Sequence, residues 1–68
     1  MLMDYYSSEI ERLMIKYYVS LSERDQRHYA AVEAAKLGHG GIAYISDLLV
    51  CSRQTISKGI EELKKMTS

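Results

Sequence analysis

One stretch decides how this 68-residue chain folds: Ile45-Ser46-Asp47-Leu48-Leu49-Val50-Cys51-Ser52-Arg53-Gln54-Thr55-Ile56-Ser57-Lys58-Gly59-Ile60. Its spacing is typical of two helices that cross steeply on either side of a short turn. Ser46 is small enough to let the helices approach, Cys51 can fill the turn with an apolar group, and Ser52 can cap the second helix. Ile56, four residues after the cap, is expected to be buried. We therefore predict a helix-turn-helix.

The second helix of this stretch carries polar side chains on the face away from Ile56. Arg53 has the forked guanidinium that matches guanine, Gln54 has the amide that matches adenine, and Lys58 suits a phosphate. A plain solvated helix face is the alternative, but the surrounding motif fits as a set and favours double-stranded DNA as the partner. The residues expected to contact DNA are Ser52, Arg53, Gln54, Thr55, Ser57 and Lys58. Many such motifs have Gly where this chain has Val50, so we expect a turn that is longer or shaped differently.

Apolar residues at steps of three and four predict the remaining helices. The first covers residues 8–20, where Ser8 and Glu11 have capping-box spacing, and its stripe comprises Ile10, Leu13, Met14, Tyr17, Tyr18 and Leu21. The second runs from its cap Ser22 to Leu37, with Tyr29, Val32 and either Ala35 or Lys36 facing inward and with Ala30, Ala31, Ala34 and Ala35 allowing a close neighbour. Gly38 suits the end of that helix. Short helices over 42–49 and from Ser52 to about Lys65 complete the chain.

The expected fold is therefore all-α, a single four-helix domain over residues 1–68. One amphipathic helix (8–20) precedes a trihelical helix-turn-helix unit (22–65), across which it should pack through Leu13, Met14 and Tyr17. The expected core comprises Leu13, Tyr17, Tyr29, Val32, Ile45, Leu49, Ile56, Ile60 and Leu63. Tyr5 and Tyr6 precede the first cap and are expected to be loosely ordered.

Charge and composition narrow the function further. Nine basic and nine acidic residues cancel, which argues against a strongly basic nucleic-acid binder. Between Cys51 and Ile60, however, there are two bases and no acid. A single cysteine suits a reducing cytoplasm, and no apolar run approaches the roughly 20 residues that cross a bilayer. We therefore expect a cytoplasmic protein with no membrane partner.

No set of residues in the sequence predicts catalysis. There is no Ser/His/Asp, Cys/His or paired-carboxylate arrangement, and the spacing of His28, His39 and Cys51 matches no zinc pattern. The loop 38–41 lacks the Gly-Lys-Ser/Thr ending of a phosphate loop, although its amides could meet a DNA phosphate. We therefore expect no enzyme, no metal, no cofactor and no small-molecule substrate.

Two resemblances to known families follow from these motifs. Ser52-Arg53-Gln54-Thr55-Ile56-Ser57-Lys58 resembles the recognition helix of lac-repressor-type regulators and of many transposases. Residues 9–65, with Leu21-Ser22-Glu23-Arg24, Leu37-Gly38-His39-Gly40-Gly41-Ile42 and Gly59-Ile60-Glu61-Glu62-Leu63, are similar to the N-terminal region of bacterial insertion-sequence transposases. In that family a catalytic domain with a DDE acidic triad follows. The resemblance implies the DNA-binding end of a transposase, or a truncated relic of one, that recognises transposon-end DNA.

A different class of function stays open beside this one. The neutral net charge and the apolar face of the first helix also suit a protein-interaction or transcription-regulator module, or a homodimer formed through that helix. DNA binding should weaken steeply with salt, whereas an apolar protein contact should not. Salt dependence therefore separates the two hypotheses.

Overall fold

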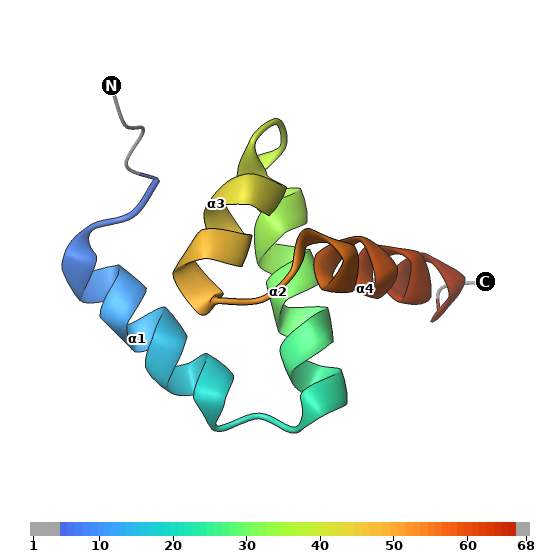
Figure 1. Ribbon diagram of the computed structural model, residues 1–68, viewed down its shortest axis with the longest axis horizontal. Helices are drawn as coiled ribbons and strands as arrows, with labels where there is room; N and C mark the ends of the chain where they lie inside the picture. Colours follow the sequence, from blue (N-terminus) through green and yellow to red (C-terminus); the bar gives the residue numbers. More distant parts are fainter. Residues whose placement is uncertain (1–4, 67–68) are drawn as a thin grey trace.

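The fold is all-α over the part of the chain that the structure describes. The computed structural model describes residues 5–66, in which four helices and no strand occur: α1 (Ser8–Val19), α2 (Glu23–Leu37), α3 (Gly41–Leu49) and α4 (Arg53–Met66). The ends of the expected domain, residues 1–4 and 67–68, lie outside the described residues. α2 runs through the middle and contacts the other three helices, whereas α1 and α4 lie on opposite sides of it (Figure 1). None of the described helices is long and apolar enough to cross a bilayer.

Serine side chains cap three of the helices. Ser22 Oγ accepts from the Asp25 N–H at 3.3 Å and Ser52 Oγ from the Thr55 N–H at 3.0 Å, as the sequence predicts. The prediction for the first helix was wrong by one residue, because the cap is Ser7, whose Oγ accepts from Ile10 N–H at 3.2 Å. The capping box therefore does not form. Glu11 instead accepts a hydrogen bond from the Tyr44 hydroxyl, which ties α1 to α3.

Small residues let α3 and α4 cross α2 at backbone distance. A Cβ added to Gly59 of α4 would lie 2.6 Å from the Arg27 carbonyl oxygen of α2, and one added to Gly41 of α3 would overlap the Ala34 carbonyl. Ala30, Ala31 and Ala34 are at most 1% exposed, so they lie at these crossings as expected, whereas Ala35 is exposed. The central position of α2 thus rests on alanine and glycine.

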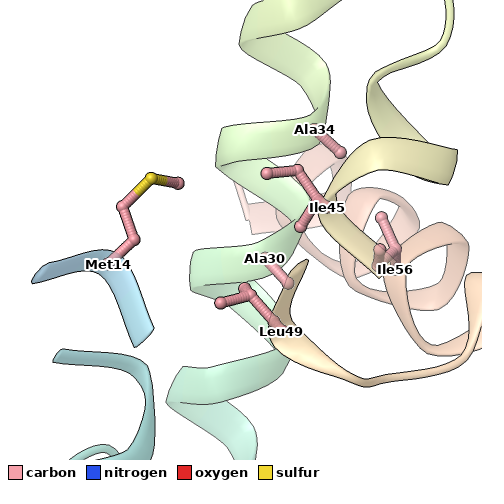
Figure 2. Close-up of a cluster of buried hydrophobic side chains, with 6 residues drawn as sticks. All are labelled: Met14, Ala30, Ala34, Ile45, Leu49 and Ile56. Carbon is pink, nitrogen blue, oxygen red and sulfur yellow. The ribbon is translucent and has the colours of Figure 1, made fainter. Parts of the chain in front are cut away.

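The core is a compact cluster around α2. Its members are Met14, Ala30, Ala34, Ile45, Leu49 and Ile56 (Figure 2). The expected burial of Ile45, Leu49 and Ile56 is confirmed, and Ser46 is buried at the α3 face as predicted. Tyr29 and Ile60 pack against this cluster only partly buried, and Leu63 is also half-buried.

Three residues expected in the core are largely exposed. Leu13, Tyr17 and Val32 keep 58%, 56% and 45% of their surface in contact with solvent. The reason is rotation about the helix axes. α1 packs through Met14 and Tyr18, one edge of its apolar stripe, and the close crossings orient the alanines of α2 inward, so that Val32 faces outward. Of the three residues through which α1 was expected to pack, Met14 is confirmed and Leu13 was wrong. Tyr17 stays largely exposed, but its ring meets that of Tyr29 edge-on at 5.2 Å.

The two N-terminal tyrosines are built into the fold, contrary to expectation. The Tyr5 hydroxyl donates to the His39 carbonyl at 3.3 Å, and its ring lies 4.7 Å from that of Tyr44. Tyr6 packs against the core cluster. Residues ahead of α1 thus cover α3, which the sequence pattern of α1 alone did not indicate.

An ionic contact joins α2 to α4 beside the core. Glu62 Oε1 accepts from Arg27 Nε at 2.9 Å and lies 2.9 Å from His28 Nε2. Hydrogen bonds from Arg27 and His28 hold the pKa of the Glu62 carboxyl below its usual range. This contact ties the second half of α4 to the first half of α2.

Candidate nucleic-acid interface

The start of α4 separates an exposed polar side from a buried apolar side. Arg53, Gln54, Ser57 and Lys58 are all exposed, whereas Ile56 between them is fully buried. Gln54, Ser57 and Lys58 point away from Ile56, whereas Arg53, three residues before Ile56, flanks it one turn towards the start of the helix. Gly59 is buried against α2 on the same inner side. Buried Ile56 and Gly59 thus anchor the helix, and the exposed residues between and before them form its solvent face within the first two turns.

Two of the six predicted site residues, Ser52 and Thr55, use their side chains to form the cap at the start of α4. The Ser52 hydroxyl accepts from the Thr55 N–H, and the two hydroxyls lie 2.8 Å apart within hydrogen-bond distance. Thr55 is only half-exposed. Ser52 and Thr55 therefore hold the start of α4 in place, and the side chains free to reach a ligand are the four on its exposed face.

Hollows on both sides make the start of α4 a ridge. One groove of about 520 Å³ lies between α4 and the α2–α3 connector and is lined by Gly38, His39, Gly40, Ile42, Ala43, Arg53 and Ser57. The second, of about 430 Å³, lies on the other side and is lined by Tyr18, Glu23, Gln26, Arg27, Cys51, Ser52, Thr55 and Lys58. A helix that stands out between two hollows has the shape that a DNA major groove admits.

The groove beside the connector brings in a residue that sequence reasoning did not place at the site. His39 is exposed and lines the same groove as Arg53, although 13 residues separate them. The only sequence signal was the glycine-rich connector, whose amides were expected to be available to a phosphate. One of these amides is used internally, because the Gly41 N–H donates to the Gly38 carbonyl at 3.0 Å.

The turn between α3 and α4 is held in a conformation that suits glycine. Val50 has φ 55° and ψ 55°, and it is the one non-glycine residue with positive φ in residues 5–66. Both Val50 N–H and Cys51 N–H donate to the Ser46 carbonyl. The expectation of a longer or differently shaped turn stays a prediction. The backbone takes the left-handed conformation regardless of the branched side chain.

Cys51 lies at the base of this turn and packs against the core as predicted. Burial raises the pKa of its thiol, and the hydrogen bond with Tyr18 lowers it by less. Because only the thiolate is a strong nucleophile or metal ligand, this environment favours an inert, structural cysteine. In the described part of the chain, no three residues among His, Cys, Asp and Glu are grouped to hold a metal ion.

The charge around the ridge is modest. Arg53 and Lys58 are its two cations. The exposed acid Glu23 of α2 lines the same hollow as Lys58. Along α4 itself, Glu61, seven residues after Gln54, carries the opposite charge on the same face. Seven residues correspond to roughly 10 Å along a helix. The acid therefore limits the surface that can approach a phosphate backbone closely to the first two turns of α4.

Comparison with known proteins adds no identification to this geometry. No family model, no curated protein and no solved structure matches the chain. The functional argument therefore depends on the residues and geometry of the chain itself.

Proposed function

We propose that this chain is a helix-turn-helix DNA-binding domain of the insertion-sequence transposase type, in which α4 enters the major groove. In this proposal α3, the Val50–Cys51 turn and α4 are the helix-turn-helix, and the chain binds DNA in the cytoplasm without catalysing a reaction itself. The transposase type is inferred because the Leu37–Ile42 connector and the Gly59–Leu63 segment resemble motifs in the N-terminal region of insertion-sequence transposases. Recognition of transposon-end DNA is part of the same proposal.

The observation that carries the proposal is the ridge at the start of α4. It presents two cations and two uncharged hydrogen-bonding side chains outward, with no acid between Cys51 and Ile60, and it is anchored by a fully buried Ile56. A rigid, capped helix start loses little freedom when it binds, because its backbone is already ordered. The two flanking hollows leave room for the phosphate backbones on each side of the groove.

Each exposed side chain suits a distinct contact. Arg53 and Gln54 belong to the first turn, which lies deepest in the groove. Arg53 carries the two donors that read guanine, and Gln54 carries the donor and acceptor that read adenine. Ser57 is short and reaches only a near base or a phosphate. Lys58 borders the second hollow, where a cation meets a phosphate.

The charge balance sets the expected affinity. Few phosphates can be neutralised by two cations on a chain of zero net charge, so non-specific binding should be about micromolar or weaker. Its affinity should still fall as salt rises, with a log–log slope of about −2 for two phosphates neutralised, whereas an apolar protein contact should change little. Tight binding would then require two copies of the domain on one DNA segment, or a second DNA-binding module.

The proposal is tested by fluorescence titration of labelled duplexes, after a preferred sequence has been selected from a random library. Arg53→Ala and Gln54→Ala should each cost about 1–3 kcal/mol on the preferred duplex and little on a scrambled one. Lys58→Ala should weaken both alike and reduce the salt slope by about one unit. Lys65→Ala removes the same charge at the far end of α4 and is the matched control.

Two results would reject the hypothesis that α4 recognises the DNA sequence. One is unchanged affinity for Arg53→Ala and Gln54→Ala while circular dichroism shows an intact fold. The other is an equal loss for Lys58→Ala and Lys65→Ala, which would indicate general attraction rather than a docked helix. The protein-interaction alternative would then gain support, because α1 leaves apolar side chains exposed.

A further inference from the structure

α1 leaves an apolar face uncovered on the outside of the molecule. Ile10, Leu13 and Tyr17 are 42%, 58% and 56% exposed, and their spacing of three and four places them side by side. We call these three residues the outer α1 face. It exists because α1 packs on α2 and α3 through Met14 and Tyr18, which lie along one edge of the helix.

Two opposite charges border this face along its free edge. Glu9 and Lys16 are seven residues apart, about two helical turns, so both lie on the edge opposite Met14. Both are exposed, and neither forms an ion pair within residues 5–66. The outer α1 face is thus negative at one end and positive at the other, along a line parallel to its apolar residues.

This pattern is complementary to itself in one orientation. We propose that the outer α1 face binds a second copy of this chain, with the two α1 helices antiparallel about a two-fold axis. In antiparallel helix pairs the same edge of each helix meets its counterpart. The register that sets Ile10 against the partner's Leu13 places Glu9 beside the partner's Lys16, and the two-fold axis repeats the pair.

A parallel arrangement lacks this complementarity. It would place the Glu9–Lys16 edge against the opposite edge of the other helix, where Met14 is 7% exposed and already packed in the core. An antiparallel register shifted to set Tyr17 against the partner's Leu13 would bring the two Lys16 side chains together. Charge therefore selects one orientation and one register.

The position of α1 makes this contact compatible with the rest of the molecule. α1 does not contact α4 within the described residues, and the two helices lie at opposite sides of the molecule (Figure 1). A copy bound at α1 leaves the start of α4 uncovered in both chains. Because one helix of 12 residues buries less surface than a standard interface, we expect a weak dimer with Kd of roughly 100 µM or above.

The test is the oligomeric state of the chain without DNA, so its result is independent of the proposed DNA binding. Sedimentation equilibrium and amide chemical shifts are followed at low salt, up to a concentration of about 1 mM. The proposal expects concentration-dependent shifts confined to α1 around Leu13. Glu9→Lys or Lys16→Glu alone should weaken dimerisation about tenfold, because each replaces two attractive pairs with two repulsive ones.

The double variant Glu9→Lys/Lys16→Glu restores the pairs and should recover the dimer. Lys65→Glu, at the exposed far end of α4, is the matched charge reversal and should have little effect. A second apolar hollow lies between α2 and α4 and is lined by Val32, Ile60 and Leu63, among others. A chain that stays monomeric at about 1 mM, a double variant that does not recover, or shifts centred on that hollow would each overturn the proposal.

Discussion

Val50→Gly should stabilise this protein, although it removes a side chain and adds flexibility. A branched residue in the left-handed conformation costs about 1–2 kcal/mol, which Gly does not incur. The opposing term is the greater freedom of Gly in the unfolded chain, about 0.4–1 kcal/mol. Val50 is 88% exposed, so almost no burial is lost, and the backbone hydrogen bonds to the Ser46 carbonyl do not involve its side chain. The net gain should be about 1 kcal/mol.

The assay is thermal and urea unfolding followed by circular dichroism. For a domain of this size, about 1 kcal/mol corresponds to a rise in Tm of roughly 4–8 °C. Val19→Gly is the control, because Val19 is also exposed but lies in the last turn of α1 with ordinary helical geometry. That change should lower stability by about 0.5 kcal/mol through helix propensity. If the two substitutions destabilise the protein equally, the left-handed turn carries no strain and the reasoning fails.

Three further substitutions test the packing of α4. Ile56→Ala empties a fully buried site and should cost about 2–5 kcal/mol, measured by urea unfolding; a loss below about 1 kcal/mol would mean that Ile56 does not anchor α4. Gly59→Ala should destabilise by about 1–3 kcal/mol despite the better helix propensity of Ala, because its Cβ would lie 2.6 Å from the Arg27 carbonyl oxygen; a gain in Tm would contradict the close crossing. Glu62→Gln should lower stability at neutral pH. Because the folded pKa of Glu62 is depressed by Arg27 and His28, its contribution is present above pH 4.5 and is lost as the pH falls through the lower folded pKa. The difference from the parent chain should therefore shrink in acid, and a constant difference in a series of Tm measurements across pH would argue against the ionic contact.

Local sequence patterns determined the helices and most of their ends. The periodicity of apolar residues predicted all four helices, and Ser22 and Ser52 were identified as caps because a serine before an apolar-periodic run satisfies free amides. The same local logic separated the exposed side of α4 from Ile56. These features depend on residues within a few positions of one another, so one sequence carries enough information to predict them.

Only the tertiary structure decided which part of each apolar stripe is buried. The stripe of α1 is broad enough to pack in more than one rotation, and contacts with α2 and α3, together with the bond from Tyr44 to Glu11, selected the edge with Met14. That choice exposed Leu13 and Tyr17. Ser7 displaced Ser8 as the cap in the same region, since two adjacent serines can each serve and the chain ahead of them is held against α3.

The turn shows the same division between local and tertiary control. The sequence indicated that residue 50 is a position where glycine is usual, but not which backbone conformation Val50 would take. Burial of Leu49 on one side and Ile56 on the other requires a short connection, and the left-handed conformation supplies it. The core thus overrides the preference of a branched side chain, because the packing free energy of two helices exceeds the strain of one residue.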